Sequence, residues 1–522
     1  MKNKIAYTII SLMLVLSLSS CDLSALTSGL QEIIDSTYNE INKTEEQEKE
    51  QEQEKEISGF FENPEDNTGN SLQLLNETFN GTKNNLNQDL YMDFSNYSLK
   101  YNANNNSKII DINKNITDYE YLNGYTPSTG NIKGLVIPID FPNYKFDKTK
   151  IYENINVSYQ SVASYYYNSS YGKLNMSFDI LPWFRASYNS YYYERMTESN
   201  QSKYTGEAPG VSRLIHEALT VAAKKFDLSK YDSNNDGLID SLHIIYNHPI
   251  NHFDSSFWWA YQYITLESYK YDGLYSFPYV FAGFDFLFED NENNNARTYI
   301  HETGHLLGLE DYYDYDLKKG YNKGSLGGFD MMDCSVGQHN AFSKISLGWI
   351  DKVLLVNLNK NEETTITIND ISSSGNVIMV CDDYNKDKGM FQTYFLFELI
   401  DIDTILLKNQ FNSLKNDGIR VYRVNASLKN YTENSYNYEY YYYDNSYTTF
   451  NLIDAINGPN SSIYPYSKYN DGIIIKNSDL FKNSLEYSTL PYSNTVNSKI
   501  SSYSFKVNKI ENNQATITFK RS

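Results

Sequence analysis

The stretch that decides the fold runs from His301 to Asp311 and reads His-Glu-Thr-Gly-His-Leu-Leu-Gly-Leu-Glu-Asp. On a helix, the imidazoles of His301 and His305 lie one turn apart on the same face. This spacing suits two positions of a tetrahedral zinc site. Because the chain contains only 7 histidines in 522 residues, a chance match to the His-Glu-x-x-His core is improbable, on the order of a per cent or less. We therefore expect one catalytic Zn²⁺ ion at this helix.

The residues around the two histidines supply a base and a third ligand. Glu302 is the expected catalytic residue, because its carboxylate can take a proton from a water molecule that zinc activates. Gly308 allows the helix to end and the chain to turn back. This turn would bring Asp311 to the metal as the third protein ligand, and the position of the glycine favours this assignment. Three other acidic residues compete for the role: Glu310, Asp314 and Asp316.

A second motif follows and reads Gly-Gly-Phe-Asp-Met-Met-Asp, from Gly327 to Asp333. It resembles the Met-turn, the tight turn beneath the zinc of metzincin peptidases. Met332 is the expected structural methionine, since a thioether offers a soft apolar floor for the histidine rings. Met331 is the alternative, and two ordinary core methionines would also explain the motif. Asn340 can cap a short helix that follows.

Four segments together resemble the immune inhibitor A family of secreted bacterial zinc peptidases: 135–141, 161–174, 231–240 and 301–349. The resemblance covers about 130–350 and continues more weakly around 394–398 and 418–424. It implies an α+β fold in which a metzincin-like zinc peptidase domain, a twisted sheet plus the active-site helix, precedes a β-rich, sandwich-like C-terminal region. Pro-regions of the family suggest one role for residues 22–130. The sequence departs from the family at Glu310, where proline is usual.

Within the third of these segments lies a candidate calcium loop, Asp232-x-Asn234-x-Asp236-Gly-x-x-Asp240. Oxygen ligands at alternate positions and a glycine for the sharp turn match the first half of an EF-hand loop. Position twelve is His243 instead of glutamate, so a complete EF-hand is not supported. The resemblance implies a structural Ca²⁺ at this place. The alternative is a metal-free turn rich in Asp and Asn.

The N-terminus resembles a bacterial lipoprotein signal. Two lysines precede an apolar run over 5–18, which is short for a membrane span and has the charge order of a secretory signal. The run ends in Leu-Ser-Ser-Cys, which resembles a lipobox with lipid attachment at Cys21. An ordinary signal with an incidental cysteine is the alternative. The lipobox predicts a protein on the extracellular face of the bacterial membrane, lipid-anchored or shed from it.

Composition and texture divide the chain into four predicted segments: a signal peptide over 1–21, a charged tether and pro-region over 22–130, the catalytic domain over 131–350, and the β-rich region over 351–522. Apolar periodicity predicts helices over 161–167 and 212–226, and strands over 135–139, 174–181 and 242–246. Pro138 indicates an edge position for the first strand. Further strands are expected over 364–368, 377–380, 394–399, 419–424 and 515–519, and the tyrosine-rich stretch 436–447 reads as a loop or a hairpin.

The predicted function is a surface-anchored zinc endopeptidase that acts on extracellular proteins or peptides. The net charge of −21 argues against nucleic acid as a partner, because phosphate binding needs basic patches. The chain is expected to be a monomer that meets the membrane only through its lipid anchor. Two alternatives are a non-catalytic adhesion lipoprotein on a peptidase fold and a zinc hydrolase of another amide. Cys334 and Cys381 could pair with each other or both be free thiols.

Overall fold

The computed structural model describes residues 57–62, 107–112, 126–147, 151–200, 209–249, 257–263, 269–276, 278–288, 296–313, 326–335, 337–404, 414–427, 429–433, 436–440, 452–460, 475–482, 485–492 and 499–522. The chain divides into two compact units, Met1–Ser58 and Gly59–Ser522. The predicted signal peptide, Cys21 and most of the charged tether lie outside the described residues. Among the helices of the described ranges, none combines the length and the apolar character that crossing a membrane requires.

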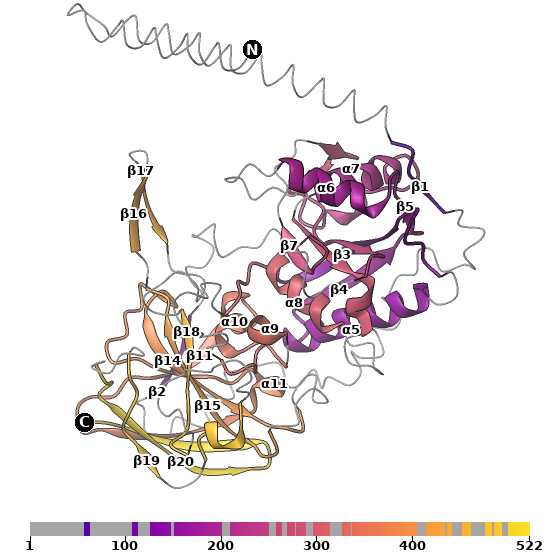
Figure 1. Cartoon of the computed structure of the whole chain (residues 1–522). Coiled ribbons are helices and arrows are strands. Elements are labelled where there is room, and N and C mark those ends of the chain that lie inside the picture. Colours follow the sequence, from indigo (N-terminus) through magenta and orange to yellow (C-terminus); the bar gives the residue numbers. More distant parts are fainter. Residues whose placement is uncertain are drawn as a thin grey trace, which may run out of the picture. The chain divides into compact units, whose positions relative to one another are not determined.

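A seven-stranded sheet forms the first half of the second unit, with the order β1-β5-β3-β6-β10-β7 and β4 paired with β3 (Figure 1). The pairs of β3 with β4, β5 and β6, and of β6 with β10, are parallel, while β7 runs antiparallel to β10. Strands buried on both faces read as continuous apolar runs, which explains the wholly buried β6 and β10. The bounds are β1 Phe60–Phe61, β3 Gly130–Asp140, β4 Leu174–Ile180, β5 Phe184–Arg185, β6 Leu242–Tyr246, β7 Tyr261–Tyr263 and β10 Tyr279–Gly283.

The edge position that Pro138 indicated is wrong, because β3 lies inside the sheet. On one side β3 pairs with β6 throughout 135–139. On its other side the pairing with β4 ends at Val136, and the pairing with β5 begins at Ile139. Pro138 therefore occupies the place where β3 changes neighbours, so that no ladder hydrogen bond on that side needs its missing N–H.

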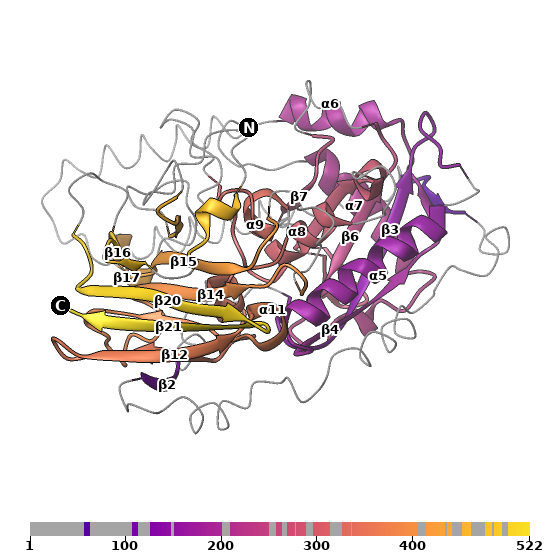
Figure 2. The ribbon, with the colours of Figure 1, turned by 90° about the horizontal axis from the view of Figure 1, so that it is seen from below.

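Helices cover both faces of this sheet. On one face the core contains α5 and α8, and on the other it contains α6 and α7, as the alternating side chains of β3 show: Val136 belongs to the first core and Leu135 and Ile137 to the second. Figure 2 shows α5 running along β3 and β4. The helices and strands predicted for this half are present, with α5 beginning ten residues earlier than expected and α7 covering 209–222 instead of 212–226. The bounds are α5 Ile151–Ser169, α6 Ser190–Asn200, α7 Pro209–Ala222 and α8 Arg297–Leu306.

Two further sheets form the C-terminal half. The six-stranded sheet has the order β18-β15-β14-β13-β11-β2, and the four-stranded sheet has the order β12-β21-β20-β19 (Figure 2). One buried apolar core contains side chains of both sheets. All five strands expected here are present, and the tyrosine-rich stretch contributes to a β16–β17 hairpin. The bounds are β2 Ser107–Asp111, β11 Lys352–Val356, β12 Glu363–Asn369, β13 Ile378–Val380, β14 Thr393–Ile400, β15 Gly418–Asn425, β16 Lys429–Glu433, β17 Tyr436–Tyr440, β18 Ile453–Ile456, β19 Glu486–Tyr487, β20 Tyr503–Glu511 and β21 Gln514–Arg521.

Several short helices, strands and 3₁₀ turns complete the fold. Two short helices lie between the two halves in sequence and contribute to the same core as α5 and α8. The structure as a whole is mixed α+β, as expected. The short elements are β8 Lys270–Tyr271, β9 Leu274–Tyr275, α9 Met331–Cys334, α10 Ala341–Ser346, α11 Ile371–Ser374, and the 3₁₀ turns Ser229–Tyr231, Phe284–Phe288 and Asn477–Asp479.

Two segments of the predicted spacer 22–130 join these sheets. β1 pairs with β5 in the first sheet, and β2 pairs with β11 at the end of the six-stranded sheet. The spacer therefore supplies strands to both halves of the molecule. Of the two cysteines that could have paired, Cys381 is a free, buried thiol, and burial raises its pKa to about 11.

Candidate metal centre

Helix α8 carries His301, Glu302 and His305, and its C-terminus turns the chain back as predicted. Gly308 has a φ of +98°, a conformation that favours glycine. The amide of Leu309 then donates to the carbonyl of Gly304 at 3.0 Å. At the other end, the N-cap is Ala296, without a side-chain hydrogen bond.

The turn brings three donor atoms together. His301 Nε2 lies 3.2 Å from His305 Nε2, and Asp311 Oδ1 lies 2.9 Å and 3.4 Å from these two nitrogens. Tetrahedral bonds of 2.0–2.1 Å to one zinc ion would place ligand atoms about 3.3–3.4 Å apart. The three atoms thus have nearly the spacing that a zinc ion requires, and the predicted ligand set is brought together.

Backbone carbonyls orient both imidazoles. His301 Nδ1 lies 2.6 Å from the carbonyl oxygen of Met331, and His305 Nδ1 lies 2.7 Å from that of Leu309. A carbonyl oxygen can only accept, so each Nδ1 must donate its proton there. In the neutral ring this leaves the lone pair on Nε2, which faces the other ligands. Histidines that bind metals usually donate the proton of their other ring nitrogen to a carbonyl or carboxylate in this way, which fixes the orientation of the ring.

Without metal, the three groups form a charge cluster. Burial opposes protonation of His305, but Asp311 outweighs it and raises the pKa of this imidazole to about 10. Burial, the largest single influence, lowers the pKa of His301, but the hydrogen bond to Asp311 and the charges of Asp311 and Glu302 together raise it above its usual value. Burial disfavours the Asp311 carboxylate, but the two histidines hold its pKa far below the usual range. A proton therefore takes the place of zinc in the metal-free form.

Glu302 lies beside the ligands and is buried, with 6 % of its surface exposed. Burial is the largest influence on the pKa of its carboxyl group and raises it. The backbone N–H of Gln262, on the edge strand β7, donates to the carboxylate. Glu302 is therefore a buried carboxyl group beside the candidate zinc ligands.

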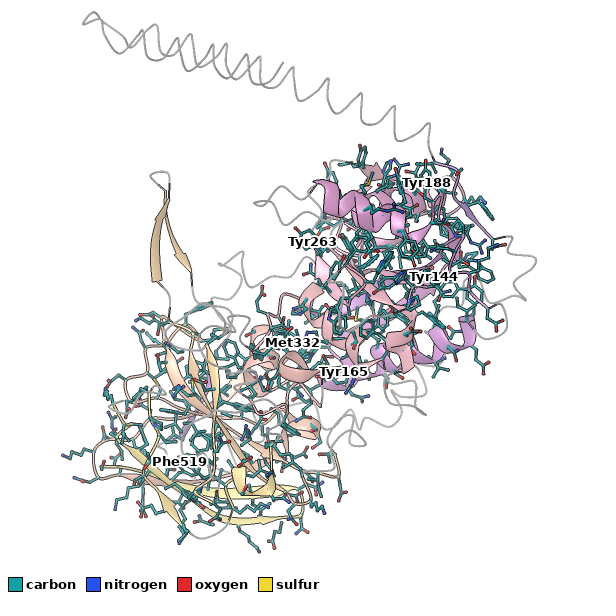
Figure 3. The ribbon with its side chains drawn as sticks, viewed as in Figure 1. Tyr144, Tyr165, Tyr188, Tyr263, Met332 and Phe519 are labelled. Atoms are coloured by element: carbon teal, nitrogen blue, oxygen red, sulfur yellow. The ribbon has the colours of Figure 1, made fainter. Side chains whose placement is uncertain are left out.

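Met332 packs directly against helix α8. A Cβ added to Gly304 would lie only 2.6 Å from Met332 Sδ, so the glycine between the histidines makes room for the thioether. Met332 is completely buried, and Figure 3 marks it on α9. Met331, the alternative, contributes its backbone carbonyl to His301 instead. Met332 is thus the side chain beneath the helix.

Of the two described members of the acidic group, Glu310 and Asp311, Asp311 lies within reach of both histidines. Its carboxylate is buried, with 3 % exposure, and belongs to the cluster of His301, His305 and Asp311 that could hold a metal ion. Glu310 is not in that cluster. Asp314 and Asp316 lie outside the described residues.

The predicted calcium loop also brings its carboxylates together. One oxygen each of Asp232, Asp236 and Asp240 lies within 4.8 Å of the others. Gly237 has a φ of +86° at the sharp turn, and Asn234 Nδ2 donates to Asp236 Oδ2 at 2.8 Å. Asp240 Oδ1 is buried without a hydrogen-bond partner among the described residues. Burial, and then its acidic neighbours, raise the pKa of Asp240. An oxygen cluster of this kind suits Ca²⁺.

Three other described histidines, His216, His243 and His248, lie outside the metal-binding clusters found among the described residues. His216 Nδ1 lies 2.8 Å from the hydroxyl of Tyr271. Glu217 pairs with Arg213 on the same helix at 2.8 Å and accepts from the hydroxyl of Tyr193, on α6, at 2.9 Å. His243 is buried in β6, with Nε2 2.9 Å from Ser241 Oγ. His248 stacks on Trp258 with ring centroids 4.3 Å apart.

The groups that orient the two histidines and Glu302 by hydrogen bonds were not predicted from the sequence. The carbonyls of Met331 and Leu309 carry no side-chain signal, and Gln262 is an isolated polar residue between two tyrosines. A signal did exist for Asp330, since aspartate before a short helix is a favoured N-cap. Its side chain accepts from the amide of Met332 at 2.8 Å and so fixes the start of α9.

No protein-family model matches the chain, and no curated protein matches it. The resemblance to the immune inhibitor A family therefore stays a prediction based on the motifs. The function has to be argued from the site.

Proposed function

We propose that the chain is a zinc-dependent endopeptidase that hydrolyses peptide bonds of extracellular proteins. The observation that carries this proposal is the meeting of His301 Nε2, His305 Nε2 and Asp311 Oδ1, with both rings oriented by backbone carbonyls. Three protein ligands leave a fourth position for water or substrate, as in catalytic zinc sites, whereas structural sites use four protein ligands. The buried Glu302 beside them supplies the base that hydrolysis needs.

Bound zinc would polarise the peptide carbonyl and lower the pKa of a water molecule. Glu302 is placed to accept the proton of the attacking water and to pass it to the leaving amine. Because burial raises the pKa of its carboxyl group, Glu302 is a stronger base than an exposed carboxylate. The backbone N–H of Gln262 holds the carboxylate in position for both steps.

An edge strand beside the base suits an extended peptide. β7 is the last strand in the sheet order, and its Gln262 contacts Glu302. Extended peptides bind to such edges by adding a strand, with backbone hydrogen bonds that are independent of sequence. We therefore take the substrate to be an unfolded or extended stretch of protein.

We also propose the domain identities, the membrane attachment and the monomeric state that the sequence predicts. The first sheet and α8 would be a metzincin-like peptidase domain, and the two C-terminal sheets a sandwich-like region. The lipobox supports attachment at Cys21 to the outer face of the membrane, with the chain acting as a monomer. The acidic charge of −21 supports protein substrates over nucleic acid.

The test is cleavage of an unfolded protein by the zinc-loaded chain. We expect peptide fragments by mass spectrometry, complete loss of cleavage after zinc is removed with a chelator, and recovery when zinc is returned. Stoichiometric zinc without cleavage of any protein, peptide or denatured substrate would favour the adhesion alternative. Cleavage confined to amides other than peptide bonds would favour the other-hydrolase alternative.

The proposal also assigns a structural Ca²⁺ to the 232–240 loop. Calcium at about a hundred times its dissociation constant adds about 2.7 kcal/mol of stability, which corresponds to roughly 5–10 °C in Tm for a domain of this size. We expect a calcium chelator to lower Tm by this amount, and calcium but not zinc to restore it.

A pair of variants makes this test specific to the loop. Asp240→Asn should abolish the calcium-dependent part of Tm, because it removes the charge of the buried ligand. Asp227→Asn is the matched control, since Asp227 is an exposed aspartate nearby that binds Ser229. A melting curve of the unaltered chain that ignores both chelator and calcium would rule out the calcium site.

A further inference from the structure

We propose that Glu398, on strand β14 of the C-terminal six-stranded sheet, is a positioning residue for the metal centre. Glu398 would act through helix α10 and through the segment of Met331 and Met332. This inference rests on the proposed zinc site. It implies that the C-terminal region contributes to zinc binding at that site. Four links of hydrogen bonds carry it, from the ligands outward.

The innermost link is made by two successive carbonyls. The carbonyl of Met331 accepts the Nδ1 proton of His301 at 2.6 Å. The carbonyl of Met332 accepts the amide of Tyr312 at 2.8 Å, and Tyr312 directly follows the ligand Asp311. The carbonyls of Met331 and Met332 therefore hold both parts of the ligand set: His301 on α8 and the backbone next to Asp311 after the turn.

The next links are made by Asp330 and Asn340. Asp330 is completely buried, and its carboxylate accepts from the amide of Met332 at 2.8 Å. Its second oxygen accepts from the backbone and side-chain amides of Asn340 at 2.8 and 2.9 Å. Asn340 in turn caps α10 by accepting from the amide of Ser343 at 3.0 Å. The start of α10 and the methionine segment are thus one hydrogen-bonded unit.

The outer link reaches the C-terminal sheet. Glu398 is completely buried, and its Oε2 accepts from the amide of Ala341, the first residue of α10, at 2.9 Å. Its Oε1 accepts the hydroxyl proton of Tyr422, on β15, at 2.9 Å. A carboxylate at the N-terminus of a helix is also favoured by the helix dipole.

The residues around Glu398 indicate that its hydrogen bond to α10 is a specific feature of the core and not an incidental contact. Along β14 the side chains alternate, and Glu398 lies on the face of Leu396 and Ile400, which belong to the core that contains α10. Burial raises the pKa of Glu398 to about 7, while the hydrogen bond from Tyr422 and the positive charge of Lys344, completely buried on α10, oppose this rise. A buried charge is costly unless it is hydrogen-bonded and paired. An apolar side chain would have filled the same space without that cost.

The experiment measures zinc affinity by chelator competition in the full chain, well below Tm. Groups that orient metal ligands from outside contribute about 10–100-fold in affinity. Glu398 acts at longer range, so we expect Glu398→Leu to weaken zinc binding by about tenfold. Glu398→Gln should bind zinc nearly normally, because its carbonyl can accept from Ala341 while its amide donates to the Tyr422 oxygen. Rescue by glutamine would identify the hydrogen bonds as the cause.

The matched control is Asp454→Leu. Asp454 is a buried carboxylate on the same sheet, but it pairs with Arg423. This control should lower Tm and leave zinc affinity unchanged. If Glu398→Leu fails to fold, Tyr422→Phe takes its place, with a smaller loss of zinc affinity expected. Wild-type zinc affinity in the folded Glu398 or Tyr422 variant, or an equal loss in the control, would overturn the inference. Lack of zinc binding by the unaltered chain would instead contradict the proposed function.

Discussion

Replacing Glu302 by glutamine is expected to lower kcat/KM for peptide hydrolysis by about 10²–10⁴-fold while zinc stays bound. Glutamine keeps the size of the side chain, and its carbonyl can still accept the N–H of Gln262. It cannot take a proton from water. With two neutral histidines and one aspartate, the zinc site carries a net charge of about +1, so its water is less acidic than at a three-histidine site and depends more on the base.

The measurement is hydrolysis of a quenched fluorescent peptide, with zinc content determined on the same samples. Glu310→Gln is the control, since it makes the same chemical change eight residues away and outside the ligand cluster. We expect full activity in this control. Undiminished hydrolysis by a zinc-loaded Glu302→Gln variant would show that another group is the base.

Asp311→Ala is expected to weaken zinc binding by about a hundredfold or more. The affinities of structural zinc sites, shared among four ligands, correspond to roughly 2.5–4 kcal/mol for each ligand. Activity at limiting zinc should fall in parallel. Elemental analysis after dialysis and chelator competition check the loss. Glu310→Ala should keep its zinc, and full retention of zinc by Asp311→Ala would remove Asp311 from the ligand set.

Asp311→Ala should also weaken the pH dependence of zinc binding. In the metal-free chain His305 holds a proton, with a pKa of about 10, and zinc must displace it. Zinc affinity should therefore rise with pH, by up to about tenfold per pH unit for one proton. Without Asp311 the group that raises this pKa is gone, so the rise at neutral pH should be weaker.

The sequence predicted the parts of the site that are local. His301, Glu302, His305 and Asp311 lie within one helix and one turn, and helix periodicity together with a glycine determines how they meet. The strands also followed from apolar alternation. In contrast, the Gln262 contact depends on which strand lies at the edge of a seven-stranded sheet, and no local pattern encodes that order.

Two misplaced expectations have the same origin. Pro138 suggested an edge because the rule for proline considers one strand alone, whereas here β3 changes partners beside it. The segments 60–61 and 107–111 lie in a polar spacer, yet they pair with β5 and β11. In both cases the structure of the segment depends on strands that are distant in sequence, and not on the β-propensity of its own residues.

The hydrogen bonds around the metal centre also set an order of events during synthesis. The ring of His301 is held by a carbonyl 30 residues downstream, and α10 is held by a carboxylate 57 residues beyond Ala341. Contacts of such separation form late, because long loops must close first. A growing chain has therefore synthesised its His-Glu-x-x-His segment well before the groups that orient it. A product truncated before Glu398 would carry the motif without the full set of groups that orient its ligands.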